Sequence, residues 1–229
     1  MARLTALVLL VLSSPLTILG CLAIRLTSPG PAVFRAERVG RDGHLFVMYK
    51  LRTMTVGSEA SGAITGGASD SRIFFVGRVL RAVKLDELPQ LVNIVRGEMA
   101  FVGPRPEAPQ IVRDHYAPWM RETLTVAPGV VGPGSLGYFL EEEQIPTDPA
   151  QAQRHYVDVL LPRKLARDLV FVRSGSSLYR AEIIVRTLLG ILRLDRVAAR
   201  RSAAESRAAE TLLASLDTRS GSAPRGAGQ

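Results

Sequence analysis

The chain opens on a long apolar run. Residues 4–24, LTALVLLVLSSPLTILGCLAI, contain no charged side chain. A helix needs about 20 apolar residues to cross the hydrocarbon core of a bilayer, so this run is long enough to be a membrane helix. A cleavable signal peptide is the alternative, but no small-residue cleavage site precedes a polar mature start. The pattern therefore favours a membrane-associated protein over a secreted one.

Ser13-Ser14-Pro15 lies in the middle of this run. Proline removes a backbone donor and collides with the preceding turn, so the helix is expected to kink there. The carbonyl group near Val11 then needs a partner inside hydrocarbon, and a serine hydroxyl can supply it. Basic residues flank both ends, beginning with Arg3 and Arg25, and positive flanks favour the cytoplasmic face. The residues alone leave two alternatives about even: a bent helix that enters and leaves by the same face, and a kinked single span.

The rest of the chain combines short strand patterns with amphipathic helices. The segment VGRDGHLFVMY is typical of two short strands joined at a glycine turn around Asp42-Gly43. Apolar residues at helical spacing predict helices over residues 72–84, 86–96, 164–173, 178–194 and 200–215. Small and polar residues predict a loop over 57–70 and a disordered end over 217–229.

These elements predict an α+β fold that is mostly helical. We expect three parts: a membrane helix over 1–27, a compact domain over 28–196, and a polar helical extension with a disordered tail over 197–229. The apolar face of the helix near 183–192 fits core packing, although its basic residues could also meet lipid headgroups.

Charge and composition narrow the partners. The chain carries 29 Lys+Arg against 21 Asp+Glu, which favours anionic partners such as nucleic acid, anionic lipid or phosphorylated small molecules. Its single cysteine, Cys21, excludes a disulfide within one chain. The three histidines lack the spacing of metal ligands. Nucleic-acid binding rests on charge alone, because aromatic residues make up 6% and no nucleic-acid motif is present, so we expect no nucleic-acid partner.

Two acids stand together in LDELPQL, residues 85–91. The simpler interpretation of Asp86 is structural, as the N-cap of the helix over 86–96, with Glu87 as a favourable charge in the first turn. The surrounding segments, however, hold more cations than two carboxylates need: Lys50, Arg52, Arg78, Arg81, Lys84, Arg96 and Arg105.

Such an excess of cations suits a site that brings a phosphate group to a carboxylate. A carboxylate can attack phosphorus to give an acyl phosphate. Because the two anions repel, the approach needs a metal ion, arginine forks and amide donors aimed at the phosphoryl oxygens. A second carboxylate can help hold Mg²⁺, which prefers hard oxygen ligands. The spacing permits this chemistry without demonstrating it.

Two segments then carry a family resemblance: SPGPAVFRAERVGRDGHLFVMYKLRTM and DSRIFFVGRVLRAVKLDELPQLVNIVRGEMAFVGPRPE. They closely resemble the bacterial sugar transferases, that is, the monotopic phosphoglycosyl transferases, and the match runs nearly unbroken from about residue 8 to 107. The resemblance implies a re-entrant helix broken at Ser14-Pro15, with both ends cytoplasmic. A small cytoplasmic catalytic domain would follow it. The protein would thus be monotopic in the bacterial inner (plasma) membrane.

The resemblance also implies a reaction. The enzyme would move a sugar 1-phosphate from a UDP-sugar to undecaprenyl phosphate, releasing UMP and starting a glycan. By motif, Asp86 corresponds to the nucleophile that forms a covalent phospho-sugar, and Glu87 to its partner acid; these two would hold Mg²⁺. Lys50, Arg81 and Arg105 correspond to residues at the substrate phosphates. Asp70, Arg72, Pro104 and Pro106 also match, and we interpret them as scaffold.

The second half of the chain departs from the family pattern. In APGVVGPGSLGYFLEEEQIP, residues 127–146, Pro128, Gly129 and Gly132 match, but the glutamine and arginine of the family are absent. This divergence motivates one alternative, a catalytically silent membrane-associated scaffold of a polysaccharide-assembly system. The intact set of Lys50, Arg81, Asp86, Glu87 and Arg105 argues against it. These residues predict neither the sugar nor the oligomeric state.

Overall fold

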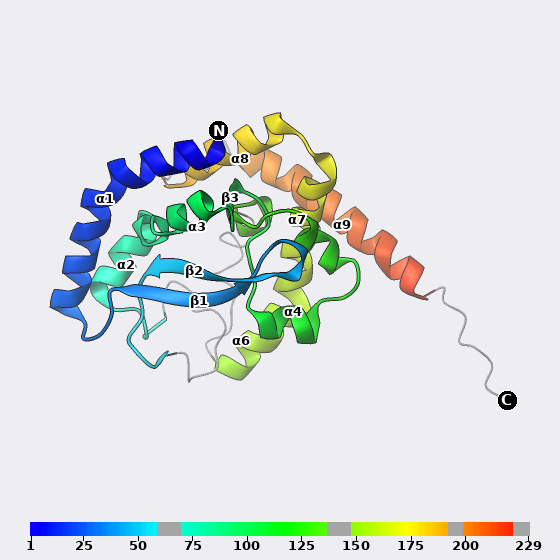
Figure 1. Ribbon diagram of the computed structural model, residues 1–229. Coiled ribbons are helices and arrows are strands. Elements are labelled where there is room, and N and C mark those ends of the chain that lie inside the picture. Colours follow the sequence, from blue (N-terminus) through cyan, green and yellow to red (C-terminus); the bar gives the residue numbers. More distant parts are fainter. Residues whose placement is uncertain (59–69, 137–147, 192–198, 222–229) are drawn as a thin grey trace.

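The computed structural model describes residues 1–58, 70–136, 148–191 and 199–221 (Figure 1). The fold is mostly helical with two small sheets, which confirms the predicted class. In chain order the main elements are α1 (Ala2–Thr27), β1 (Val33–Val39), β2 (Leu45–Leu51), α2 (Phe75–Ala82), the 3-10 turn η3 (Leu85–Glu87), α3 (Gln90–Arg96), β3 (Ala100–Val102), α4 (Pro109–His115), β4 (Gly129–Val131), α6 (Pro149–His155), α7 (Leu161–Ser174), α8 (Ser177–Ile191) and α9 (Ala199–Gly221).

The apolar run forms the single long helix α1. Its mean hydropathy reaches 2.4, and within the described residues it is the one helix long and apolar enough to cross a membrane. The helix is not interrupted at Pro15 but bends along its length (Figure 1). Ser14 Oγ donates a hydrogen bond to the Val11 carbonyl at 2.7 Å, which confirms that a serine satisfies the group that proline leaves without a donor.

The inner face of α1 packs on the domain at both ends of the helix. Near its start, Ala6 is buried against Ile94 of α3, and near its end Ile24 is buried against Leu51 of β2. Gly20 favours this approach, since a Cβ there would lie 2.8 Å from a methyl carbon of Leu51 and would have to displace that side chain. The whole helix therefore lies along one side of the domain (Figure 1).

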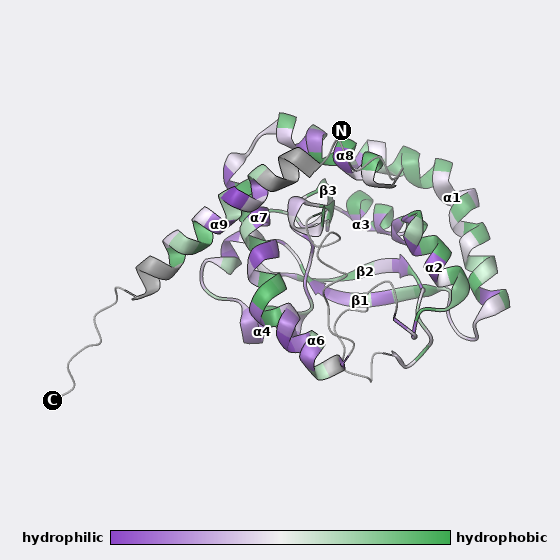
Figure 2. Cartoon of the chain, turned by 180° about the vertical axis from the view of Figure 1, so that it is seen from behind, coloured by the Kyte–Doolittle hydropathy of each residue, from purple (hydrophilic) through white to green (hydrophobic). Residues whose placement is uncertain are grey.

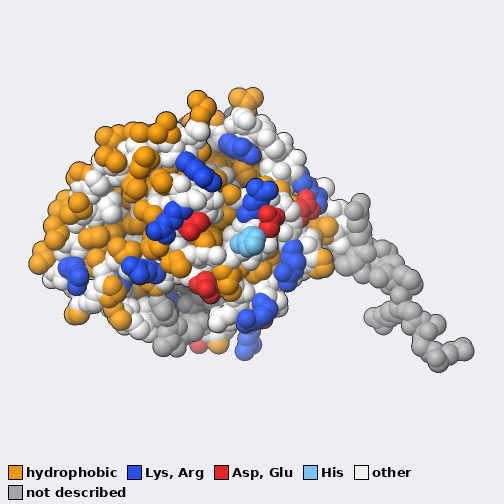
Figure 3. All heavy atoms as spheres, in the orientation of Figure 1, with side chains coloured by type: hydrophobic (Ala, Val, Ile, Leu, Met, Phe, Trp, Pro, Cys, Tyr) orange, Lys and Arg blue, Asp and Glu red, His pale blue; other side chains and the backbone are white. Residues whose placement is uncertain are grey.

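The outer face of α1 is apolar and exposed. Figure 2 shows the helix as hydrophobic along most of its length, and hydrophobic atoms follow its arc over the surface in Figure 3. The exposed large apolar side chains of this face are Leu4, Leu7, Val8, Leu9, Val11, Leu12, Leu16, Ile18, Leu19, Leu22 and Leu26. Contiguous apolar surface of this kind marks a site of membrane or partner contact.

The predicted hairpin is confirmed. β1 and β2 pair antiparallel, with Val33 opposite Leu51 and Val39 opposite Leu45. Asp42 has φ 55° and Gly43 φ 82°, so the turn uses the left-handed region that Asp and Gly tolerate best. The inner face of this hairpin packs on α3 and α1.

A second, parallel pair of strands joins β3 to β4, and its short strands were not predicted. Two glycines let the following turns touch through their backbones. A Cβ on Gly132 would lie 2.3 Å from the Gly103 carbonyl oxygen, and one on Gly129 would lie 2.1 Å from the Gly103 nitrogen. Since β3 leads directly into Gly103-Pro104-Arg105, this contact fixes the start of that turn.

Several helix ends differ from the predictions. The helix over 86–96 starts only at Gln90, with Pro89 at its N-cap, so Asp86 is not the N-cap as predicted. α4 and α6 were not predicted. The predicted disordered end overlaps α9, which continues through Gly221. Residues 59–69 of the predicted loop, 192–194 of the helix over 178–194, and 222–229 lie outside the described residues.

Candidate functional site

Asp86 lies in the short turn η3 between α2 and α3. Lys84, just before this turn, has φ 59°, a left-handed conformation that costs a non-glycine residue about 1–2 kcal/mol. This reversal directs η3 against β2. Asp86 is 5% exposed, and its Oδ1 has no hydrogen-bond partner within the described residues. A buried carboxylate oxygen without a partner is costly and points to a functional role.

Glu87 is held by Arg105 from the turn after β3. Arg105 Nη2 and Nη1 donate to Glu87 Oε1 and Oε2 at 2.8 and 3.4 Å. Nη1 also donates to the Val130 carbonyl of β4 at 2.8 Å. A guanidinium fork on a carboxylate fixes direction as well as charge. The pair therefore joins η3 to the β3–β4 sheet.

Lys50 brings a third charge from β2. Its Nζ lies 3.8 Å from Glu87 Oε1. Burial lowers the pKa of Lys50 to about 8, helped by the positive charge of Arg105 and opposed by Glu87 and Asp86. The ammonium group is therefore charged at neutral pH and loses its proton in mildly alkaline solution.

Arg81 reaches the site from the last turn of α2. Its Nε donates to Thr53 Oγ1 at 2.8 Å. Gly77 allows the close contact of α2 with this segment, because a Cβ there would lie 2.2 Å from the Thr53 carbonyl oxygen. Burial raises the pKa of Asp86, and the positive charge of Arg81 is one of those that oppose this rise. Sequence reasoning missed Thr53; its place inside KLRTM, beside Lys50, was the signal that could have found it.

The two neighbouring carboxylates have opposite pKa shifts. Burial raises the pKa of Asp86, with Lys50 opposing it and the negative charge of Glu87 adding to it. Burial also acts to raise the pKa of Glu87, but the charges of Arg105, Lys50 and Lys84 outweigh it, so that pKa is lowered. Pairs of acids whose environments separate their pKa values commonly take different chemical roles.

The structure thus brings together all five predicted site residues, Lys50, Arg81, Asp86, Glu87 and Arg105. Two further cations of the predicted excess lie elsewhere. Arg52 is buried and binds the Pro31 carbonyl at 2.6 Å and Ser28, where the chain leaves α1. Arg96 donates to Tyr49 Oη at 2.9 Å on the surface. Both have structural partners, so not every cation of the predicted excess serves the site.

The scaffold residues form their own contacts. Arg72 binds Asp70 through both carboxylate oxygens, with Nη2 2.6 Å from Oδ2. After Pro104 and Pro106, the buried Glu107 pairs with Lys164 of α7 and accepts a hydrogen bond from Tyr156 at 2.7 Å. Sequence reasoning missed this buried pair, which secures the far end of the turn that carries Arg105.

The acid pair can accept a divalent ion. Among the described residues no cluster of three or more metal-ligating side chains is present. Mg²⁺ does not require one, since it commonly takes one or two carboxylates together with water and substrate phosphates. Within the part of the chain that the structure describes, Asp86 Oδ1 has no hydrogen-bond partner, and the Glu87 carboxylate is adjacent in sequence. The donor set therefore fits Mg²⁺ bound together with a phosphorylated substrate.

The acid pair of Asp86 and Glu87, with Lys50, Arg81 and Arg105 around it, has a composition suited to binding phosphate groups. Comparison with known proteins agrees with this class. Residues 1–194 match the model of the bacterial sugar transferase family. The chain belongs to this family.

Named relatives share this assignment. Over 194 residues the chain is 34% identical to the UDP-glucose:undecaprenyl-phosphate glucose-1-phosphate transferase of Caulobacter vibrioides, which covers 83% of this chain and 67% of that protein. Over 198 residues it is 47% identical to the undecaprenyl-phosphate glucose phosphotransferase of Komagataeibacter xylinus, covering 81% of this chain and 34% of that protein. A UDP-N-acetylgalactosamine-undecaprenyl-phosphate N-acetylgalactosaminephosphotransferase of Aeromonas hydrophila is 39% identical over 131 residues, covering 56% and 31%. The chain thus spans only part of the length of these relatives.

Proposed function

We propose that the protein is a phosphoglycosyl transferase that moves a sugar 1-phosphate from a UDP-sugar to undecaprenyl phosphate, releasing UMP and starting a glycan. The observation that carries the proposal is the buried Asp86, whose Oδ1 has no partner among the described residues and which lies within the field of Lys50, Arg81 and Glu87. The names of the relatives support the donor and the acceptor.

In the first step, a carboxylate oxygen of Asp86 attacks the β-phosphorus of the UDP-sugar. The bond from that phosphorus to the bridging oxygen breaks, and UMP leaves with the electron pair. In the second step, a phosphate oxygen of undecaprenyl phosphate attacks the same phosphorus, the bond to Asp86 breaks, and the carboxylate is restored. Lys50, Arg81 and Arg105 offset the negative charge that both steps bring together.

The environment of each acid fits its proposed role. Burial removes water from the Asp86 carboxylate, and a poorly solvated anion is a better nucleophile. Glu87 remains ionised because its neighbours lower its pKa, so it can contribute oxygen to Mg²⁺. When bound, Mg²⁺ would neutralise part of the diphosphate charge and favour departure of UMP.

We also propose that α1 is re-entrant, with both ends on the cytoplasmic face of the inner membrane. Ala6 and Ile24, near opposite ends of the helix, are both buried against the same domain. A helix that crossed the bilayer would carry one of these ends about 30 Å away from a domain on the other side. A helix lying along the domain also brings the site to the level of the lipid headgroups, where the phosphate of undecaprenyl phosphate lies.

The test is UMP release from a panel of UDP-sugars with undecaprenyl phosphate, by full-length protein in detergent micelles. We expect Asp86→Asn to abolish UMP release while it still enters the membrane fraction. The exposed acid Asp158 provides a matched control, and Asp158→Asn should release UMP at the wild-type rate. Removing divalent ions with a chelator should stop the reaction, and Mg²⁺ should restore it.

Two results would count against the proposal. Lipid-linked sugar made by the Asp86→Asn protein would exclude the proposed nucleophile. No UMP from the wild-type protein with any donor would favour the alternative of a catalytically silent scaffold. Full activity in the presence of chelator would exclude only the proposed role of Mg²⁺.

A further inference from the structure

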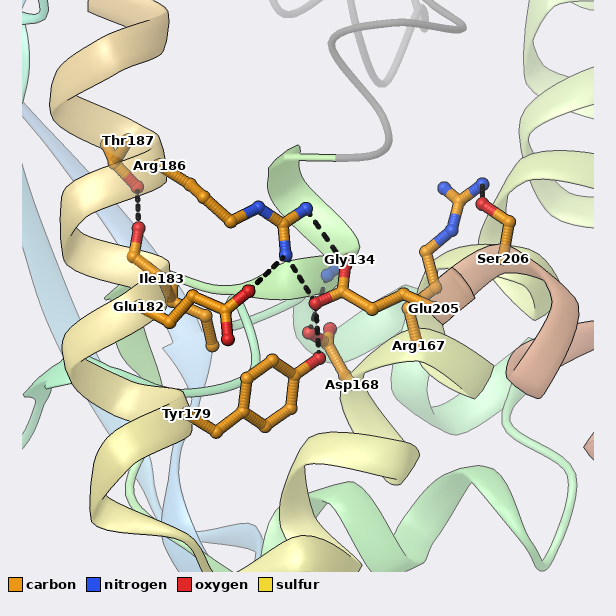
Figure 4. Close-up of polar contacts among 10 residues, drawn as sticks. All are labelled: Gly134, Arg167, Asp168, Tyr179, Glu182, Ile183, Arg186, Thr187, Glu205 and Ser206. Atoms are coloured by element: carbon orange, nitrogen blue, oxygen red, sulfur yellow. Dashed lines mark hydrogen bonds and ion pairs between the residues drawn. The ribbon is translucent and has the colours of Figure 1, made fainter. Parts of the chain in front are cut away.

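Helix α9 lies beyond the part of the chain that matches the family. The family match ends at residue 194, and α9 spans Ala199–Gly221. The helix nevertheless packs along α7 and meets both α7 and α8 through two adjacent residues, Glu205 and Ser206 (Figure 4). This raises the question of what the contact does for the domain.

Glu205 is the centre of the contact with α8. Its Oε2 accepts a hydrogen bond from Arg186 Nη2 at 3.0 Å, and its Oε1 accepts from Arg186 Nη1 and from the Tyr179 hydroxyl. The side chains of Arg186 and Glu205 are 7% and 11% exposed. A buried guanidinium needs such a partner, because an unpaired buried charge is strongly destabilising. Ser206 accepts from Arg167 Nη2 of α7 at 3.2 Å.

One route leads from this contact to the site through α8. Ile183, one turn before Arg186, is fully buried and packs with Val102 at the end of β3. Val102 comes directly before Gly103-Pro104-Arg105. A shift of α8 would therefore move the start of the turn that carries Arg105.

A second route leads through α7. Asp168, next to Arg167, accepts a hydrogen bond from the Gly134 backbone N–H at 3.0 Å (Figure 4). The neighbouring Gly132 touches the Gly103 carbonyl through its backbone. The α8 contacts thus reach Val102 and the α7 contacts reach Gly103, three and two residues before Arg105. The guanidinium of Arg105 binds Glu87 beside Asp86.

We propose that Glu205 is a positioning residue: α9 holds α8 through Glu205, and α7 through the adjacent Ser206, against the β3–β4 sheet, and so sets the position of Arg105 relative to Asp86. This inference rests on the proposed function for the role of Arg105, but the coupling from α9 to the turn does not. On this proposal, α9, which lies beyond the family match, is part of the catalytic domain of this chain.

The test separates positioning from simple stabilisation by single-turnover UMP release, in full-length protein without acceptor. The amplitude counts competent sites, and the rate constant reports the geometry of each site. We expect Glu205→Ala to lower the rate constant by about tenfold to 100-fold, the range produced by small displacements of reacting groups, at unchanged amplitude. The exposed Glu210 on the same helix supplies the control variant Glu210→Gln, which should match the wild type. The exchanged pair Arg186→Glu with Glu205→Arg should recover part of the rate.

Hydrogen exchange of the backbone provides a readout independent of activity. The Gly103 and Gly129 amides donate within the sheet and turn, to Val131 and Pro104 carbonyls at 2.9 and 2.8 Å. Glu205→Ala should speed their exchange, and Glu210→Gln should not. An unchanged rate constant with unchanged exchange at these amides would overturn the inference, even if the melting temperature fell. If the wild-type protein released no UMP, the proposed function would fail, and the exchange result would still decide the coupling.

Discussion

Replacing Arg105 by leucine tests the electrostatic account of the site. The substitution removes both hydrogen bonds to Glu87 and the one to the Val130 carbonyl. Breaking one side of a buried ion pair costs about 3–5 kcal/mol, because the remaining charge stays buried. The side chains of Arg105 and Glu87 keep 17% and 14% of their area exposed, so we expect a loss at the lower end of this range, about 3 kcal/mol.

This loss converts into a measurable change in melting temperature. For a chain of this size, 1 kcal/mol of stability corresponds to about 2–4 °C, so Arg105→Leu should melt about 6–12 °C lower. Glu87→Gln keeps an acceptor for Arg105 and should cost only about 1 kcal/mol. In that background position 87 carries no negative charge that Arg105→Leu could leave without its partner, so the double variant should show a coupling energy of about 2 kcal/mol.

The pH dependence of stability provides a second test of the ion pair between Arg105 and Glu87. The lowered pKa of Glu87 contributes stability that is present above the pKa of its unfolded state, about 4.3, and is lost as pH falls through the folded value. Without Arg105, the pKa of Glu87 is lowered less, so this contribution shrinks. The difference in stability between wild type and Arg105→Leu should therefore stay constant from pH 7 to about 5 and narrow as pH falls below about 4.3. A coupling energy below about 0.5 kcal/mol, or a difference independent of pH, would refute the reasoning.

Two further predictions concern other titrating groups. The pKa of Lys50, about 8, predicts that the rate of UMP release falls in alkaline solution. The Lys50→Arg variant stays charged, so its rate should fall only at higher pH. If the rate of this variant still falls near pH 8, another group is responsible for the fall. Burial raises the pKa of Asp168 to about 7, with Lys164 and Gly134 opposing it, so stability should decline as pH rises from the unfolded value of about 3.9 to about 7, by up to about 1.4 kcal/mol per pH unit. Asp168→Asn still accepts from Gly134 and should flatten the melting temperature between pH 5 and 8; an unchanged slope would contradict this assignment.

Much of the local structure was predictable from the sequence. The apolar run, the hydrogen bond from Ser14 to Val11 and the hairpin around Asp42-Gly43 all follow from residues close together in the chain. Proline, glycine and apolar spacing act over one or two turns, and their effects do not depend on what packs against them. The five site residues were found through motifs, and the structure brings all five together.

Tertiary packing decided the rest. Asp86 was predicted to be an N-cap because an acid before an apolar helix usually has that role. In the structure, Lys84 is left-handed and the helix starts only at Gln90. Asp86 therefore lies outside the helix, within the field of Lys50 and Arg81. β3 and β4 are too short to show a strand pattern in the sequence. They pair where Gly103, Gly129 and Gly132 allow two backbone segments to approach closely.

Contacts between distant segments are invisible to any local pattern, because the energy of a buried charge depends on which partner arrives from elsewhere in the chain. Nothing near Arg186 indicated that Glu205 would bind it, and nothing near Glu107 indicated Lys164. Local patterns thus predicted most of the helices, the β1–β2 hairpin and the chemical groups of the site. Only the folded structure determined that both ends of α1 lie on one domain and that α9 packs against α7 and α8.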